Sequence, residues 1–184
     1  MYIKKNEVNE AEKFIDSEFD RLISWLIGDI KRCCRLTEDG TCDTGGALVD
    51  AFILWIVAID FFGGIFTNCV LQGETKRRFK EFVTKYMPQY DYEKLLDLRW
   101  SLLHFYTTRH YAFHQNNDIG MCRKVHLSSS SNGVVLDLSC AISDLENATE
   151  KYKADLHNSG ELKVRLFRYF KVTNPLVPIK FEYR

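Results

Sequence analysis

The chain has 184 residues, which is enough for one domain with a hydrophobic core. Hydrophobic residues make up 46% of it and only three residues are proline, a composition typical of ordered globular proteins and not of disordered ones. The 25 Lys and Arg residues balance the 25 Asp and Glu residues, so no overall positive field attracts nucleic acid, and any contact with RNA must come from a local patch.

The cysteines are expected to be reduced thiols of a cytoplasmic protein: Cys33, Cys34, Cys42, Cys69, Cys122 and Cys140. The absence of a Cys-x2-Cys pair argues against a structural zinc site. Cys122 and His126 have the spacing of two metal ligands, but no matching second pair accompanies them, so we expect no metal and no other cofactor. The charged residues 1–7 are not followed by the apolar core of a signal peptide.

The first predicted element is an amphipathic helix over residues 10–35, whose apolar side chains recur at helical spacing on one face. This pattern is typical of an outer helix of a bundle. A loop rich in turn-forming residues is expected over residues 37–46.

Residues 47–70 form the most apolar segment of the chain. Asp50 and Asp60 interrupt it and leave residues 51–59 as the uncharged run between them, far short of the roughly 20 residues that a bilayer requires. We therefore predict a buried central helix and no membrane contact. Because a buried carboxylate is costly unless it is paired, both aspartates need partners. The Gly63-Gly64 pair is expected to end or kink this helix, or to let another backbone approach closely.

A short helix with a basic face is predicted to begin at Glu74 and to end before Pro88. It carries the densest positive cluster of the sequence: Lys76, Arg77, Arg78 and Lys80. A solvated helix face explains this cluster, and the alternative is a weak RNA-binding patch directly before the next helix.

The next helix is predicted over residues 91–107, and it combines a buried face with reactive side chains. Its apolar residues recur at helical spacing: Leu95, Leu98, Leu102 and Phe105. Arg99 and His104 lie in the same stretch. A guanidinium that holds a phosphate, beside an imidazole that titrates near neutrality, is sufficient to cut a phosphodiester without a metal.

The sequence Arg99-x4-His104-x-Tyr106 resembles the Arg-x4-6-His motif of the HEPN superfamily (higher eukaryotes and prokaryotes nucleotide-binding domain) in its Arg-x4-His-x-Tyr form. Residues 92–104 are also similar to the start of this helix in uncharacterised bacterial members. One position differs, because Trp100 follows the arginine where active members commonly have Asn, Asp or His.

The resemblance implies a mainly α protein, a HEPN-like up-and-down helical bundle that spans residues 1–184 as one domain. It also implies a metal-independent endoribonuclease of a toxin–antitoxin or phage-defence system. Arg99 would hold the scissile phosphate, and His104 would be the general acid or base at the ribose 2′-hydroxyl or the leaving oxygen. Ser101 would add a hydrogen bond. DNA would not be cleaved, because only RNA has the internal nucleophile.

On an ideal helix, residues five apart differ by about 140° in direction and about 7.5 Å in rise, so Arg99 and His104 do not share a face. A compact site requires a distorted helix or two chains that meet on a two-fold axis. The resemblance implies the second arrangement, a homodimer with a composite site. It further implies that a nucleotidyltransferase antitoxin attaches nucleotides to Tyr106.

Three alternatives remain open. The first is a catalytically inactive HEPN-like module that binds a protein or a nucleotide, with Trp100 filling the groove. The second is a structural role, in which Arg99 pairs with an aspartate and His104 is a core residue. The third is a metal or small-ligand site at His110 and His114, which have i, i+4 spacing; Arg109 and His114 also repeat the Arg-x4-His pattern.

Beyond this region the period changes to alternation, which predicts a β-hairpin over about residues 123–138 with an Asn-Gly turn before the last two helices. The first of these helices is expected to begin at Ser139 or Ser143 and to stop near residue 158, and the second to begin at Glu161. An extended tail is expected over about residues 174–184.

Overall fold

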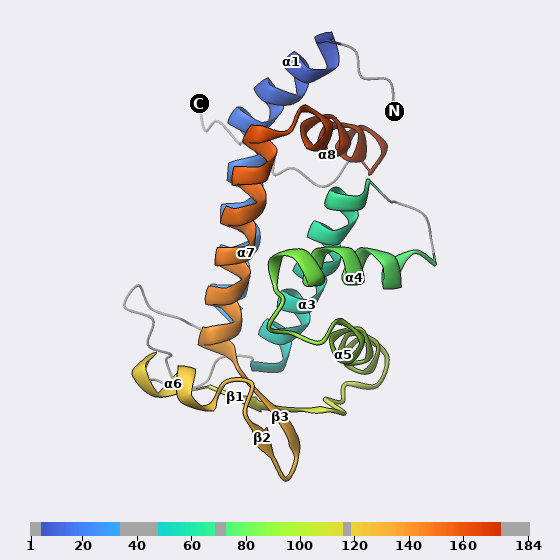
Figure 1. The fold of residues 1–184 in the computed structure, drawn as a ribbon. Helices are drawn as coiled ribbons and strands as arrows, with labels where there is room; N and C mark the ends of the chain where they lie inside the picture. The colour runs from blue at the N-terminus through green and yellow to red at the C-terminus, as the bar shows by residue number, and fades with distance from the viewer. Residues whose placement is uncertain (1–4, 34–47, 69–72, 116–118, 174–184) are drawn as a thin grey trace, which may run out of the picture.

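Helices supply most of the secondary structure in the computed structural model, which describes residues 5–33, 48–68, 73–115 and 119–173 (Figure 1). The elements are α1 (Lys5–Phe14), a π-helical turn (Ile15–Phe19), α2 (Asp20–Cys33), α3 (Leu48–Thr67), α4 (Thr75–Tyr86), α5 (Tyr92–Phe105), β1 (Tyr111–His114), α6 (Ile119–Val125), β2 (Ser129–Ser130), β3 (Gly133–Asp137), α7 (Leu138–Asn158) and α8 (Gly160–Thr173). The mainly α class is confirmed. The predicted loop over residues 37–46 and the tail over residues 174–184 lie outside the described residues.

The predicted N-terminal helix is present as α1, the π-helical turn and α2 in one run. Phe14 and Asp20, which flank the turn, both have right-handed helical backbone angles, so the chain does not bend away there. The buried side chains follow at steps of four through this region: Ile15, Phe19, Ile23 and Ile27. In a regular helix of 3.6 residues per turn, side chains four residues apart rotate steadily around the helix axis. The wider π-helical turn offsets this rotation, so these side chains stay on one face.

Helix α3 is the central helix, as predicted. It is the one described helix that is long and apolar enough to cross a membrane, but 56% of its most apolar window is buried inside the molecule. Trp55 in its middle donates from Nε1 to the Ala141 carbonyl of α7 at 2.8 Å. The helix therefore has the position of a core helix.

The Gly63-Gly64 pair lies inside α3 and does not end it. A Cβ at Gly63 would lie 2.7 Å from the Arg78 carbonyl oxygen of α4, and one at Gly64 would lie 2.9 Å from the Tyr169 ring of α8. Of the predicted roles, close approach by a neighbouring element is the one that is observed.

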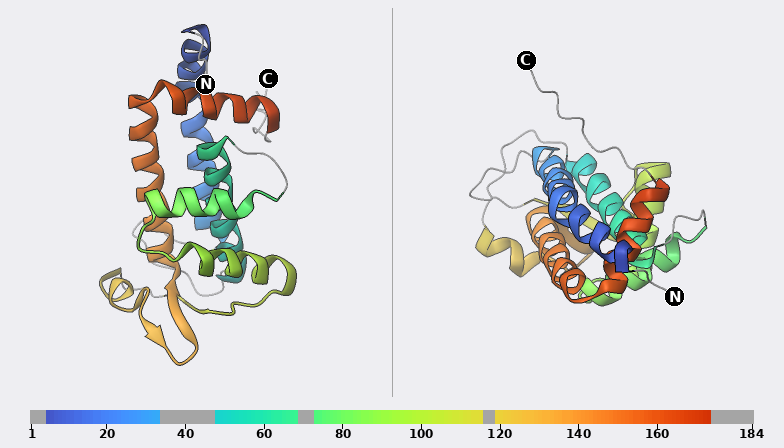
Figure 2. Two further views of the ribbon diagram at one scale, coloured as in Figure 1. Left: turned by 45° about the vertical axis from the view of Figure 1, so that its right-hand side comes forward. Right: turned by 90° about the horizontal axis from the view of Figure 1, so that it is seen from above.

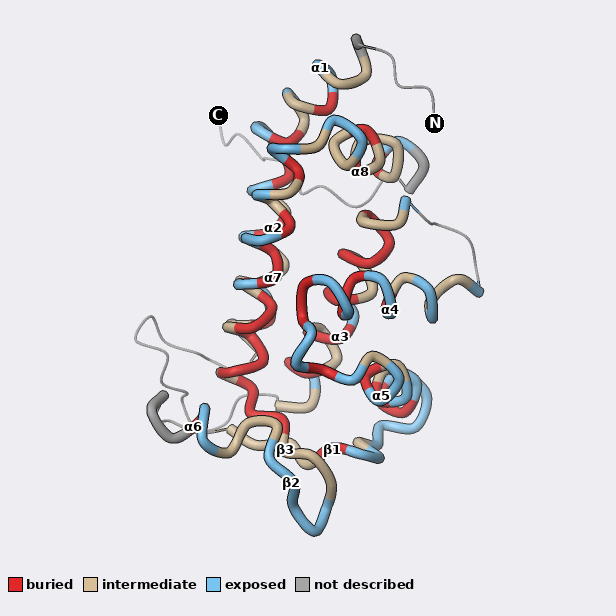
Figure 3. Tube along the Cα trace, in the orientation of Figure 1, coloured by how far each residue is buried: buried red, intermediate tan, exposed pale blue. Residues whose placement is uncertain are grey.

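Helices α2, α3 and α7 lie side by side, and α4, α5 and α8 cross them (Figures 1 and 2). The arrangement is therefore a helical assembly with two directions and not a simple up-and-down bundle. One continuous hydrophobic core extends from Ile15 to Phe170. Figure 3 shows that the buried faces turn toward this core, while the outer side of α5 and the β2–β3 turn are exposed.

The β-hairpin predicted over residues 123–138 is confirmed only for residues 129–137. Strands β2 and β3 pair antiparallel around residues 131 and 132, but residues 119–125 form helix α6 and not the first strand. Strand β1, for which the sequence pattern predicted no strand, pairs parallel with β3. Gly133 makes this pairing possible, because a Cβ there would lie 2.3 Å from the His110 carbonyl oxygen.

Helix α7 begins earlier than predicted. Its N-cap is Asp137, whose side chain accepts from the Cys140 N–H at 3.2 Å, and not Ser139 or Ser143. It ends at Asn158 as expected, and α8 begins at Gly160, one residue before Glu161.

Candidate functional site at the end of helix α5

Local capping fixes both ends of α5. The Asp91 carboxylate accepts from the Glu93 and Lys94 N–H groups at 2.9 and 3.3 Å. At the other end Tyr106 adopts the left-handed conformation with φ 54°, and its N–H bonds to the Ser101 carbonyl oxygen. The helix therefore stops directly after the motif residues, within two residues of the predicted boundaries.

Arg99 points toward the molecule and binds α3. Its Nη2 lies 3.1 Å from Oδ2 of Asp60, and the same carboxylate binds Nε of Arg78 at 2.9 Å. The Arg99 and Asp60 side chains are 21% and 14% exposed, so the ion pair is only partly screened by water. Two guanidinium groups around one carboxylate leave a local charge of +1. Of the partners considered for Arg99, Asp60 is the one that it binds.

His104 lies on the opposite, solvent-exposed side of α5. Its ring centroid lies 4.4 Å from that of Trp100, which is 55% exposed. Phe105 and Tyr106 are 60% and 62% exposed, and Leu103 is also exposed. We refer to Trp100, Leu103, His104, Phe105 and Tyr106 together as the aromatic end of α5. It is an apolar patch that the described chain leaves uncovered, with one titratable imidazole inside it.

The structure does not bring Arg99 and His104 together within one chain. The guanidinium binds Asp60 in the interior, and the imidazole contacts Trp100 outside, as the helical spacing of the two residues requires. His104 is exposed and is not a core histidine. A single described chain therefore presents two separate halves of the predicted site.

Of the other two predicted site residues, Ser101 is buried and Tyr106 is exposed. Ser101 is buried, and its hydroxyl donates to the Asp97 carbonyl oxygen at 2.8 Å, so it does not face the aromatic end of α5. Tyr106 is exposed, and its hydroxyl donates to Oδ1 of Asp50 at 3.4 Å. Desolvation and the neighbouring Asp50 carboxylate raise the pKa of Tyr106, so its phenol is protonated at neutral pH.

The basic cluster on α4 is largely engaged with acidic or aromatic side chains. Arg78 binds Asp60, and Arg77 lies 3.1 Å from a carboxylate oxygen of Glu74. The two lysines have longer contacts: Lys76 lies 3.6 Å from Glu93, and the Lys80 ammonium lies 6.0 Å from the Tyr92 ring centroid. The cations therefore point to different neighbours and do not converge on one phosphate-sized position.

His110 and His114 do not form the helical i, i+4 pair that their spacing suggested, because His114 lies in β1 and His110 in the turn before it. His110 pairs with Asp97 at 3.3 Å and His114 pairs with Asp137 at 2.9 Å. Arg109 occupies a turn with φ 45°. The helical pair of metal ligands suggested for His110 and His114 is therefore wrong. The second Arg-x4-His copy, Arg109 to His114, does not lie on a helix.

A buried polar network joins the loop before α5 to α7, and the sequence analysis did not find it. Tyr90 donates to Oδ2 of Asp144 at 2.9 Å, Arg123 donates to Oδ1 at 2.6 Å, and Nε2 of His126 lies 2.8 Å from the Tyr90 hydroxyl. Burial alone would raise the pKa of Asp144, but hydrogen bonds from His126, Arg123 and Tyr90 outweigh it and hold that pKa well below its usual range.

A second group found only in the structure consists of Cys122, Asp137 and Cys140, which come from α6, β3 and α7. Cys122 and Cys140 are 18 residues apart in the sequence, and only the folded chain brings them together.

No protein-family model matches this chain, and neither the curated proteins nor the solved structures include a significant match to it.

Proposed function

We propose that the chain is a HEPN-like, metal-independent endoribonuclease that acts as a homodimer. The observation that supports this most is the aromatic end of α5, because it places His104 inside an uncovered apolar patch of large side chains. Such patches mark interaction surfaces, and a second copy of the chain would cover this one by pairing α5 with α5. In one chain Arg99 and His104 lie on different sides of α5. In the proposed homodimer, His104 of one chain lies beside Arg99 of the other, and together they form a composite site.

Arg99 has the donors that a phosphate requires. Asp60 binds its Nη2, and its buried Nε has no hydrogen-bond partner among the described residues. The local charge of +1 that Arg78 and Arg99 leave around Asp60 favours an anion. In the proposed reaction, His104 removes the proton from the ribose 2′-hydroxyl, and Arg99 stabilises the charge that develops on the phosphate oxygens.

The proposed setting is a cytoplasmic toxin–antitoxin or phage-defence system. Tyr106 is exposed beside His104, so a nucleotide attached to its hydroxyl by a nucleotidyltransferase antitoxin would cover the aromatic end of α5. The basic residues of α4 remain a weak secondary RNA contact, since Lys76 and Lys80 are exposed. DNA is not a substrate in this proposal.

The test is cleavage of a single-stranded RNA by the purified protein in EDTA, with the matched DNA as control. We expect cleavage of the RNA alone, and a loss of at least about 100-fold in His104→Ala, because general acid–base catalysis contributes on that order or more. Arg99→Ala should lose activity similarly. Cleavage that survives both substitutions, or that requires a divalent metal, would contradict the mechanism.

A second candidate is a catalytically inactive HEPN-like module that binds a partner through the same surface. Two contacts favour it: the Trp100 indole packs against His104, and Asp60 neutralises Arg99. If this candidate holds, neither the wild-type protein nor Trp100→Asn, which places a polar residue after Arg99, cleaves RNA, while the wild-type protein still associates through α5.

A further inference from the structure

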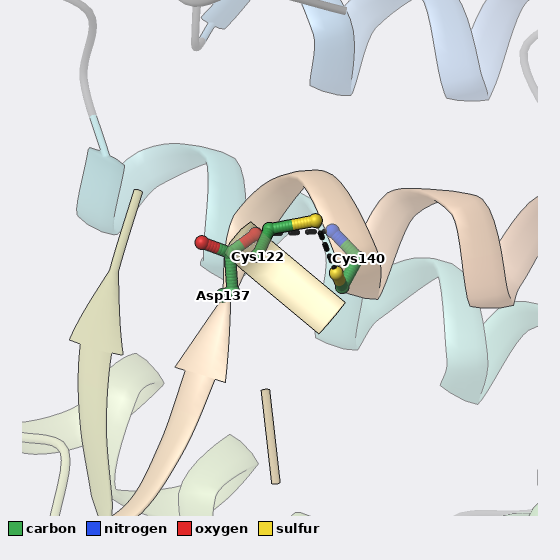
Figure 4. A group of neighbouring side chains, drawn as sticks. All are labelled: Cys122, Asp137 and Cys140. Carbon is green, nitrogen blue, oxygen red and sulfur yellow. Dashed lines mark hydrogen bonds between the residues drawn. The ribbon is translucent and has the colours of Figure 1, made fainter. Parts of the chain in front are cut away.

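A buried cluster of two thiols and one carboxylate lies where α6, β3 and α7 meet (Figure 4). Cys122, Asp137 and Cys140 are each at most 2% exposed, and their sulfur and oxygen ligand atoms all lie within 4.8 Å of one another. The cluster is separate from α5 and plays no part in the proposed cleavage. Two thiols and one carboxylate are ligand types that zinc binds in proteins.

The backbone holds two of these residues on one turn. Asp137 is the N-cap of α7 and Cys140 lies three residues later, which is the x2 spacing that ligand pairs use at structural metal sites. His126, whose spacing from Cys122 is that of two metal ligands, does not join the cluster, because its ring nitrogens bond to the Tyr90 hydroxyl and to the Asp137 N–H. The fold instead brings Asp137 and Cys140 to Cys122 as the further candidate ligands.

We propose that Cys122, Asp137 and Cys140 bind a divalent transition metal of the zinc class. Thiolates select soft or borderline ions, and two thiolates with one carboxylate supply three of the four positions of a tetrahedral site. The metal would tie the short helix α6 to β3 and to the first turn of α7.

Asp137 is oriented for this role by hydrogen bonds to both of its oxygens. Oδ1 accepts from the Cys140 N–H at 3.2 Å, and Oδ2 lies 2.9 Å from Nδ1 of His114. These two bonds fix the orientation of the carboxylate within the cluster. His114 is thus a positioning residue, of the kind whose loss typically weakens metal affinity about 10–100-fold.

Binding requires a small adjustment of the thiols. Their sulfur atoms lie 2.7 Å apart, whereas two sulfurs at about 2.3 Å from one tetrahedral ion lie about 3.8 Å apart. Rotation of either side chain about its Cα–Cβ bond moves its sulfur by this difference of about 1 Å. Burial and the neighbouring Cys122 thiol raise the pKa of the Cys140 thiol, so the metal has to displace its proton.

The experiment measures bound zinc and thiol protection in the full chain. Protein purified under reducing conditions without chelator, then incubated with zinc and desalted, should retain about one zinc per chain, and Cys122 and Cys140 should resist alkylation until chelator is added. Cys33, a partly exposed thiol outside the cluster, is the internal control and should react equally in both states.

Matched variants separate ligation from folding. Cys122→Ser and Cys140→Ser should lose the zinc, and Cys33→Ser should retain it. His114→Ala should bind zinc about 10–100-fold more weakly, while His157→Ala at the exposed end of α7 should bind it normally. Because a ligand variant can fail for lack of folding, the wild-type protein is also melted with and without chelator, and zinc should raise its Tm.

Two results would overturn the proposal. One is wild-type protein that retains no zinc and shows equal alkylation of its buried thiols with and without the metal. The other is a chain two hydrogens lighter, with Cys122 and Cys140 joined in a disulfide even in reducing buffer, because that bond consumes both sulfur ligands.

Discussion

At the residue scale, single carboxylates organise the two polar centres of this protein. Asp60 joins α3 to α4 and α5 through Arg78 and Arg99, and Asp144 joins α7 to Tyr90 and Arg123. Each carboxylate is largely withdrawn from water, so its neighbours depend on its charge more than they would at the surface.

Asp60→Asn tests the first centre. The substitution keeps the shape but leaves two half-buried guanidinium groups facing each other without a counter-charge, so we expect a loss of about 1–3 kcal/mol in the free energy of unfolding. Urea denaturation measures this. Asp29→Asn, which breaks an exposed ion pair with Arg32, is the control and should change stability by less than about 1 kcal/mol. Equal effects of the two substitutions would show that burial of the Asp60 pair contributes nothing.

Asp144 gives a dependence of stability on pH. Its pKa is lower in the folded than in the unfolded chain, where a carboxyl titrates near pH 3.9. The folded state therefore binds this proton less readily, and the stabilisation is fully present above about pH 4 and decreases as the pH falls further. We expect Asp144→Asn to destabilise the protein at pH 7 by about 2–3 kcal/mol and by less at pH 3. Unfolding curves at both pH values test this; a difference that grows toward pH 3 has the wrong sign.

At the element scale, hydrophobic periodicity predicted α5 and a continuous apolar segment predicted α3, and both helices contribute side chains to the same core. Periodicity failed for β1 and α6, since four residues and seven residues carry too short a pattern. Strand β1 exists because β3 lies beside it, which is a tertiary effect. The same limit applies to the candidate site: Arg99 and His104 were found from their motif, whereas Asp137 and Cys140 meet Cys122 only after folding.

Gly63 tests the close packing of α3 on α4. Gly63→Ala places a Cβ 2.7 Å from the Arg78 carbonyl oxygen, a backbone atom, so we expect a loss of about 1–3 kcal/mol in stability. Gly28→Ala in α2 is the matched control. Its new Cβ meets only the flexible end of Arg32 at 3.3 Å, and alanine favours the helix by up to about 1 kcal/mol. The two changes should therefore have opposite signs in thermal unfolding, and stabilisation by both would refute the close contact.

At the scale of the whole molecule, the aromatic end of α5 is the surface through which we expect two chains to associate. Phe105→Glu places a charge in the patch and should weaken self-association at least about 10-fold, as measured by sedimentation. Trp25→Glu, at an exposed aromatic residue of α2, should leave association unchanged. A protein that is monomeric at all concentrations, or a Trp25→Glu variant that dissociates equally, would remove α5 as the interface.

The most direct test of the central claim is a mixing experiment between two inactive variants. In a composite site, a heterodimer of Arg99→Ala and His104→Ala contains one site with an intact Arg99 from one chain and an intact His104 from the other. Random pairing makes half of the dimers mixed, so RNA cleavage should return to roughly a quarter of the wild-type rate. A mixture as inactive as its separate components, measured where exchange of chains is complete, would contradict the account.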